Sequence, residues 1–133
     1  MYSREVLDHF HNPRNVGEID EPSAVVTASN PVCSDAIKLW VRVREGKITD
    51  VTFKVQGCVP SVACASWLTV AIKGKPVAEL AALSAEQIES GLGGLPVASR
   101  HASMLAVEAL RKAIEKLGRQ GVAKSEFRNA DSE

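Results

Sequence analysis

The 133-residue chain is 45% hydrophobic and 24% charged, which are the proportions of a globular domain with its own core. Its sixteen basic and sixteen acidic side chains cancel, so no global charge favours a nucleic acid or an anionic membrane as partner. The N-terminal residues are too highly charged for a secretion signal, and three cysteines, an odd number, argue against a disulfide framework, so we expect a cytoplasmic protein.

A short helix is predicted at the N-terminus, because Ser3 is a residue type that caps helices well. Its apolar stripe consists of Val6, Leu7 and Phe10. Pro13 then ends the helix, and residues 23–29 have the composition of an edge strand. His9 and His11 cannot share a helical face, so we expect them to be structural or to face a partner.

Two segments of alternating polarity follow and predict an antiparallel hairpin. Alternate residues are apolar over residues 37–43, and the alternation resumes over residues 51–55. Apolar side chains must meet on the buried face, so Val41 is expected opposite Val51. This register leaves a three-residue loop, residues 45–47, which is a normal hairpin length.

Two further helices are predicted between the hairpin and a glycine-rich loop. Pro60 suits the first turn of one helix, and "KGKP" ends it. The inner stripe of this helix is Val62, Ala65, Leu68 and Ile72. Residues 84–87 fit a capping box, which begins a helix that stops at Gly91.

The last helix begins near His101 and has the clearest periodicity. Its predicted inner face is Met104, Val107, Leu110, Ile114 and Leu117. We expect one α+β domain over residues 1–118, with a small antiparallel sheet of about three strands packed on one face by helices, of which the C-terminal helix is long. Residues 119–133 are polar and lack periodicity, so we expect a disordered tail.

Cysteine and aspartate side chains come together at one end of the predicted hairpin. Cys33 and Asp35, at i and i+2 on a strand, point to the same face, where a thiolate and a carboxylate can share an ion. The alternative is a packed cysteine beside an aspartate that caps a turn. The hairpin register also places Cys58 opposite Ser34, which supplies a second thiol. Cys58 would face the wrong way in a regular strand, but we expect Gly57 to adopt backbone angles that let it swing round. Metal or cluster binding and simple packing both stay open on these residues.

Two other side chains are candidates for the same site. Cys64 falls at the edge of the inner stripe of its helix, so packing is the better interpretation, although it is a reserve thiol. His101 lies at the start of the last helix, where the positive end of the dipole favours the neutral imidazole that binds metals. Taken alone, His101 would more often be a surface residue near a helix cap.

Four segments, in this order, give the sequence a family resemblance: "YSREVLDHFHNPRNVG", "CSD", "KVQGC" and "LPVASRHASMLAVEAL". Together they make it resemble the IscU and NifU N-terminal family of iron-sulfur cluster assembly scaffolds over residues 1 to about 118. The resemblance implies an α+β domain that receives sulfur from a cysteine desulfurase. It also implies that a [2Fe-2S] cluster is built on cysteine ligands and passed to acceptor apo-proteins. Some members bind zinc in the same pocket.

Carried over by position, the resemblance makes Cys33 and Cys58 two of three cluster cysteines, Asp35 the residue that keeps the cluster labile, and His101 the histidine at the pocket rim. The third cysteine is absent, because Ala102 follows the histidine. The family's chaperone-recognition motif, Leu-Pro-Pro-Val-Lys, is here "LPVAS", so recognition by an Hsp70-type chaperone is not expected.

The leading hypothesis is therefore a scaffold or carrier of a labile cluster, not an enzyme, with Cys33, Asp35, Cys58 and His101 as the four donors. The runner-up is a ligand-depleted relative that binds zinc in the same pocket or regulates a cysteine desulfurase. A thiol enzyme with His101 as base ranks last, because no oxyanion hole is evident. Whether Cys64 replaces the absent thiol is left open by the sequence.

Overall fold

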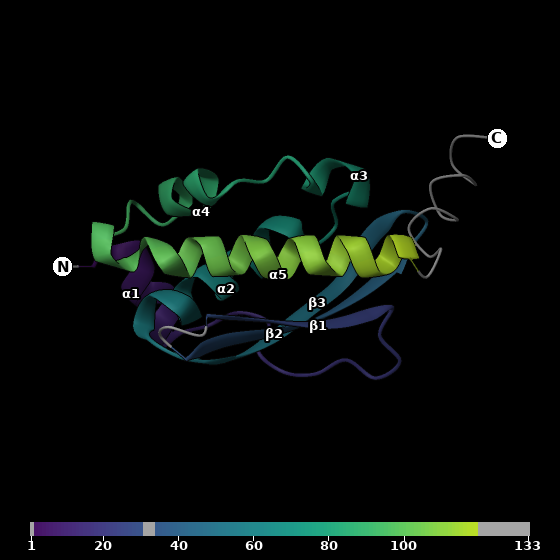
Figure 1. Ribbon diagram of the computed structural model, residues 1–133, viewed down its shortest axis with the longest axis horizontal. Helices are drawn as coiled ribbons and strands as arrows, with labels where there is room; N and C mark the ends of the chain where they lie inside the picture. The colour runs from purple at the N-terminus through teal and green to yellow at the C-terminus, as the bar shows by residue number, and fades with distance from the viewer. Residues whose placement is uncertain (1, 31–33, 120–133) are drawn as a thin grey trace.

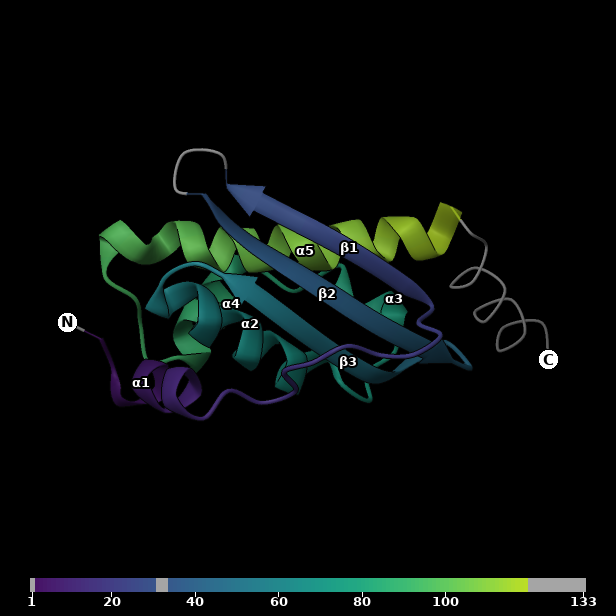
Figure 2. The ribbon, with the colours of Figure 1, turned by 90° about the horizontal axis from the view of Figure 1, so that it is seen from below.

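The computed structural model describes residues 2–30 and 34–119. A three-stranded antiparallel sheet in the order β1-β2-β3 is covered on one face by helices (Figures 1 and 2). The elements are α1 (Arg4–His11), β1 (Ala24–Asn30), β2 (Asp35–Arg44), β3 (Lys47–Gln56), α2 (Val59–Ile72), α3 (Val77–Leu80), α4 (Ala85–Gly91), the 3-10 turn η1 (Val97–Ser99) and α5 (Arg100–Arg119). The predicted α+β class, antiparallel sheet and long C-terminal helix are confirmed.

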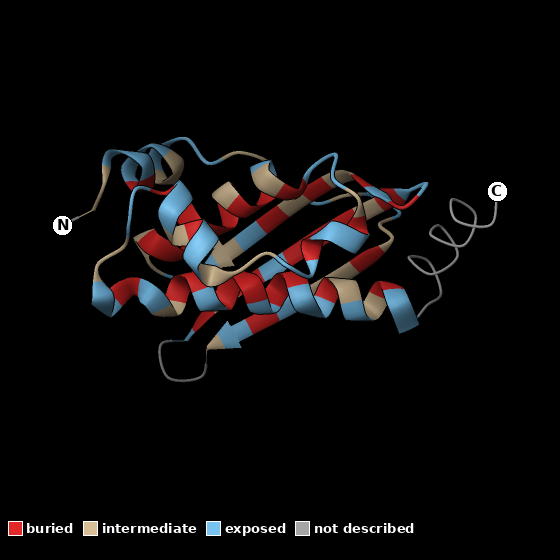
Figure 3. Ribbon diagram, turned by 90° about the horizontal axis from the view of Figure 1, so that it is seen from above, coloured by how far each residue is buried: buried red, intermediate tan, exposed pale blue. Residues whose placement is uncertain are grey.

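The core lies between the sheet and the two longest helices. Figure 2 shows the sheet in front, with α5 and α2 behind it. Every second residue of β2 from Ile37 to Val43 is buried, as the alternating pattern predicts, and buried residues line the sheet and helices that face each other (Figure 3). Trp40, which the alternation assigns to the opposite face, is buried as well. Helix α2 is apolar nearly all round because α1, α4, α5 and the sheet all contact it. Among the described residues, no helix combines the length and the apolarity needed to span a bilayer.

The predicted hairpin register is confirmed, but the predicted loop is wrong. Val41 does pair with Val51. The loop, however, is the two-residue turn Glu45–Gly46, with φ of 55° and 77°, and such left-handed pairs suit the twist of a tight hairpin. The difference arises at Thr49, which lies between the partners of Arg42 and Val43 as an extra residue in β3.

Both outer edges of the sheet are covered by other parts of the chain. Beside β3, the segment after α1 forms a short parallel bridge, in which the Gly17 amide donates to the carbonyl of Phe53 at 3.0 Å. Beside β1, Lys112 and Lys116 of α5 donate to two strand carbonyls at 3.1 and 2.8 Å. These lysines hinder edge-to-edge pairing with another chain.

Two of the predicted helix faces need correction. Met104, assigned to the inner face of α5, is 64% exposed, and Val62 of α2 is only half-buried. In α5 the buried face is made largely of small residues, because alanines allow the helix to lie close to the sheet and to α2. Helix α5 also continues to Arg119, so that residue belongs to the helix and not to the expected tail. Residues 120–133 lie outside the described residues.

Candidate metal centre

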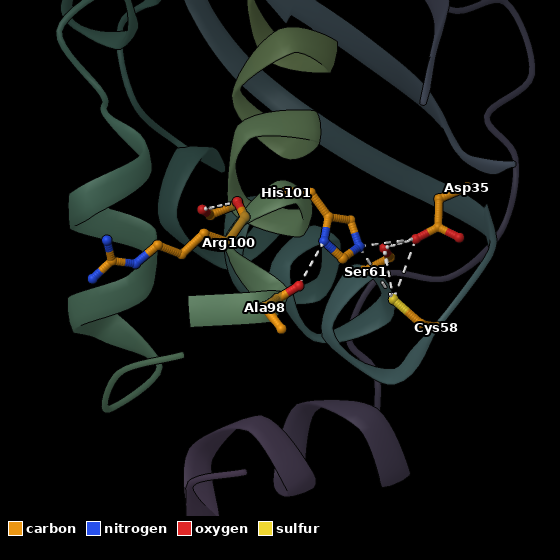
Figure 4. Close-up of polar contacts among 7 residues, drawn as sticks. Asp35, Cys58, Ser61, Ala98, Arg100 and His101 are labelled. Atoms are coloured by element: carbon orange, nitrogen blue, oxygen red, sulfur yellow. Dashed lines mark hydrogen bonds and ion pairs between the residues drawn. The ribbon is translucent and has the colours of Figure 1, made fainter. Parts of the chain in front are cut away.

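Asp35, Cys58 and His101 meet where three elements begin (Figure 4). Asp35 is the first residue of β2, Cys58 is the N-cap of α2, and His101 lies in the first turn of α5. We call these three residues the donor cluster. Because β3 ends before Cys58 and Pro60 suits the first turn of α2, Cys58 is released from the strand alternation that would have turned it away.

Gly57 allows this arrangement through its small size. A Cβ atom at this position would lie 2.8 Å from Cγ of Asp35 and 2.9 Å from its Oδ1. Any other residue would therefore push the Asp35 carboxyl group out of place. Gly57 is not one of the glycines with positive φ, so the expectation that it contributes unusual backbone angles is wrong.

The donor atoms of the cluster are spaced like the ligands of one ion. Cys58 Sγ lies 3.2 Å from Asp35 Oδ2 and 3.9 Å from His101 Nε2. His101 Nε2 lies 3.6 Å from the same Asp35 oxygen. A tetrahedral ion with bonds of about 2.0–2.3 Å keeps its ligands about 3.3–3.8 Å apart. The three groups therefore need to move only slightly to share one ion.

The backbone fixes which nitrogen of His101 faces the cluster. Nδ1 lies 3.1 Å from the carbonyl oxygen of Ala98, which can only accept a hydrogen bond. The proton of the neutral ring is therefore on Nδ1, and the lone pair of Nε2 faces Asp35 and Cys58. This is the tautomer that a metal-binding histidine needs.

Asp35 is 6% exposed, yet the balance of its contacts favours the charged form of its carboxyl group. Burial alone would raise its pKa. Hydrogen bonds from Ser61 and Cys58, and the attraction of the His101 ring when that ring is protonated, outweigh burial, so the pKa of Asp35 lies below its ordinary value. At neutral pH the cluster thus contains a carboxylate, the form that binds cations.

Of the other two cysteines, the structure describes only Cys64, which stands apart from this cluster. Cys33, the remaining predicted ligand, lies outside the described residues. Cys64 is fully buried, and burial, followed by the nearby Glu89 and Cys58, raises the pKa of its thiol to about 12. A thiol in that state packs as a small apolar side chain, as the sequence favours.

Sequence reasoning missed one residue of this region, Ser61. Its hydroxyl donates to Asp35 Oδ2 at 2.7 Å and lies 3.4 Å from Cys58 Sγ. The one available signal was its spacing, because residues i and i+3 share a helical face at the start of α2. Nothing in the sequence distinguished it from the other serines.

Comparison with known proteins identifies the family. A family model described as the NifU-like N-terminal domain matches residues 1–123. The chain belongs to this family. The iron-sulfur cluster assembly scaffold protein IscU 1 of Archaeoglobus fulgidus is 42% identical to this chain over 114 residues. The match covers 86% of this chain and 74% of that protein.

A bacterial relative and a solved structure agree with this assignment. The iron-sulfur cluster assembly scaffold protein IscU of Aquifex aeolicus is 41% identical to this chain over 116 residues. The match covers 86% of this chain and 74% of that protein. The N-terminal NifU-like protein of Brucella abortus has the same fold, with a TM-score of 0.74 and 22% identity over 88% of this chain and 94% of its own. In this NifU-like chain, the position after His101 is Ala102, which is fully buried.

Proposed function

We propose that this chain is a scaffold or carrier that holds a labile [2Fe-2S] cluster and passes it to acceptor apo-proteins. The observation that carries this proposal is the convergence of a thiol, a carboxylate and a ligand-ready imidazole within 4.8 Å of one another. Cys33 is the fourth proposed donor, on the sequence alone. The protein acts as a carrier of cargo in the cytoplasm and not as an enzyme with turnover.

The donor set explains why the cluster would be held loosely. Most [2Fe-2S] clusters are bound by four thiolates, although Rieske centres replace two of them with histidines. Here only Cys33 and Cys58 supply sulfur, and Asp35 offers a hard oxygen that binds soft metal centres less well. The side chain of His101 is 30% exposed, so an acceptor protein can approach the cluster from that side.

The proposed partners are those that a scaffold requires. A cysteine desulfurase would supply the sulfur, and acceptor apo-proteins would receive the finished cluster. We do not propose an Hsp70-type chaperone, because the segment Leu95–Ser99 lacks the second proline and the lysine of the family's motif. Neither nucleic acid nor membrane is a proposed partner.

Zinc binding in the same place is the second candidate. The three donor atoms are spaced for one tetrahedral ion. A zinc site does not require two sulfur ligands, because histidine and carboxylate groups also bind zinc. A chain that holds zinc and cannot build a cluster would be the ligand-depleted relative considered above, which could act by regulating a desulfurase.

Anaerobic reconstitution separates these functions. We expect ferrous iron and sulfide to give visible charge-transfer absorption in the wild-type protein, and Cys58→Ala to abolish it. Cys64→Ala is the matched control, because it removes a thiol from the same helix that is fully buried outside the donor cluster. If the protein binds one zinc per chain and shows no absorption after reconstitution, the result supports zinc binding and contradicts the cluster function. Equal loss in both variants would contradict the proposed ligands.

Restoring the absent thiol tests the donor count. Ala102→Cys would supply the cysteine that the family resemblance implies at this position. If the rest of the site is intact, the variant should retain its cluster longer than the wild type during chelation, since thiolate binds iron more tightly than oxygen does. An unchanged or shorter lifetime would mean that this site has diverged beyond one ligand.

A further inference from the structure

The environment of Ser61 goes beyond the proposed ligands. Ser61 lies in the first turn of α2 and is fully buried. Its hydroxyl donates to Asp35 Oδ2 at 2.7 Å, and Figure 4 shows it beside the carboxylate, with dashed lines to Asp35 and to Cys58. Burial of a hydroxyl is costly without a hydrogen bond, so this contact is a fixed part of the structure.

The same carboxylate oxygen faces all three neighbouring side chains. Asp35 Oδ2 accepts from Ser61 and from the Cys58 thiol, and it lies 3.6 Å from His101 Nε2. When a metal binds, Cys58 must lose its proton, so its hydrogen bond to Asp35 disappears. The Ser61 hydroxyl keeps its proton. The hydrogen bond from Ser61 can therefore stay on one lone pair of Asp35 Oδ2 while the other lone pair of the same oxygen binds the ion.

A carboxylate needs such a contact because its last torsion is soft. The terminal torsion of aspartate has broad minima, so the side chain alone does not fix the direction of its oxygens. In this site Gly57 leaves the space that Oδ1 occupies, since a Cβ there would lie 2.9 Å from Oδ1. The absence of a side chain does not fix the carboxylate, whereas the Ser61 hydroxyl donates directly to its other oxygen, Oδ2.

We propose that Ser61 is a positioning residue, whose hydroxyl holds Asp35 Oδ2 turned toward the point between Cys58 and His101. This inference rests on the proposed function, because the orientation matters only if the donor cluster takes up metal. Ser61 itself is not a ligand. Its part is to present the carboxylate in a direction that binding requires.

Zinc affinity measures this effect directly. Partners that orient metal ligands are typically worth about 10–100-fold in affinity. We expect Ser61→Ala to lower the affinity about tenfold in competition with a chromophoric chelator. Ser66→Ala is the matched control, because it removes another fully buried hydroxyl of α2 and should leave zinc affinity unchanged. Ser61→Thr keeps the hydroxyl and should retain most of the wild-type affinity.

A double-mutant cycle shows whether Ser61 acts through Asp35. In an Asp35→Ala background, Ser61→Ala should have no further effect on zinc affinity, since the group that it orients is gone. A second tenfold loss in that background would overturn the inference. Wild-type affinity in Ser61→Ala alone would overturn it as well.

The metal-free protein provides an independent measurement. The carboxyl ¹³C resonance of Asp35 should shift in Ser61→Ala and stay in place in Ser66→Ala, because only the first variant removes a hydrogen bond to that group. An unchanged resonance in Ser61→Ala would overturn the positioning role. If the wild type binds neither zinc nor cluster, the proposed function fails, and this resonance still reports whether Ser61 orients Asp35.

Discussion

Helix α2 carries two polar clusters that are similar in composition and differ in what their atoms face. The donor cluster lies at its start. The second cluster joins the middle of α2 to α1 and to the loop after it, and we call it the anchor cluster. It consists of His9, Arg14, Asn15, Ser66 and Thr69. The anchor cluster contains a histidine and the buried Ser66, and the donor cluster contains a histidine and lies beside the buried Ser61, so residue types alone do not separate them.

The acceptors of the anchor cluster are paired with donors, although the buried Arg14 Nη1 has no hydrogen-bond partner among the described residues. The Arg14 amide donates to Ser66 Oγ at 2.9 Å, which leaves the hydroxyl proton of Ser66 for His9 Nδ1 at 2.7 Å. Asn15 donates to Thr69 Oγ1 at 3.0 Å. Each of these acceptors meets a donor from its neighbour, so the cluster holds α1 in place without an added ion.

The donor cluster instead aims lone pairs at a common point. His101 Nε2, Asp35 Oδ2 and the sulfur of Cys58 face one another, and two of these groups become anionic when deprotonated. Such an arrangement is stable only with protons or a cation between the groups. The contrast shows that a metal site is recognised by converging acceptors, whereas a structural cluster is recognised by matched donor and acceptor pairs.

The largest effect is expected from Gly57→Ala, which forces the donor cluster apart. The new Cβ would lie 2.8 Å from Asp35 Cγ, and Asp35 is held by Ser61, so the carboxyl group must leave its position. We expect zinc affinity to fall about 100-fold and the free energy of unfolding to fall by about 1–3 kcal/mol. Chelator competition and urea denaturation measure the two quantities.

Gly118→Ala is the control for adding a methyl group to glycine. A Cβ at Gly118 meets no atom within 4 Å, and the residue lies in α5. We therefore expect unchanged zinc affinity and a gain in stability of up to about 1 kcal/mol. Unchanged zinc affinity in Gly57→Ala would show that Asp35 does not contribute to binding from its observed position.

The next effect separates the two histidines. His101→Ala should lower zinc affinity at least tenfold, while the free energy of unfolding stays within about 0.5 kcal/mol because the side chain packs at the surface. His9→Ala should lower the free energy of unfolding by about 1 kcal/mol through its lost hydrogen bond to Ser66 and leave zinc affinity unchanged. Zinc titration and urea denaturation of both variants provide the test, and the reverse pattern would contradict our assignment of the two clusters.

The sequence predicts the sheet better than it predicts these clusters. Alternating apolar residues determine which faces meet, so the pairing of Val41 with Val51 follows from the pattern. The extra residue Thr49 leaves no such signal, because a threonine fits a regular strand as well as a bulge. Met104 was misplaced for a related reason: four of the nine buried residues of α5 are alanines, which a search for large apolar residues overlooks.

The site was predictable in part. The hairpin register brings Asp35 and Cys58 together, because it depends only on local pairing. His101 was added through its family resemblance and its place at a helix start, but its contact with the other two depends on how α5 packs, which no periodicity encodes. Ser61 and the anchor cluster are likewise products of packing between distant segments.

A smaller effect is expected from pH. Burial, followed by the charge of Arg14, lowers the pKa of His9, while Asp8 acts in the opposite direction. Above the unfolded pKa of about 6.5 His9 is neutral in both states. As the pH falls below that value the unfolded chain takes up the proton more readily, so stability decreases. Urea denaturation between pH 7.5 and 5.5 should show a smaller decrease in His9→Gln than in the wild type. Parallel curves would contradict the role of His9.

The smallest effect is expected at Cys64, which lies on α2 between the two clusters and belongs to neither. Its thiol is fully buried with a pKa raised to about 12, so at pH 8 only about one molecule in ten thousand is a thiolate. Iodoacetamide should therefore modify Cys58 in the native protein and leave Cys64 intact, and of these two cysteines zinc should protect Cys58. Peptide mass mapping distinguishes the two sites, and urea should expose Cys64. Modification of both cysteines at equal rates in the native protein would mean that α2 opens locally, and that the start of this helix is not the rigid support that the donor cluster requires.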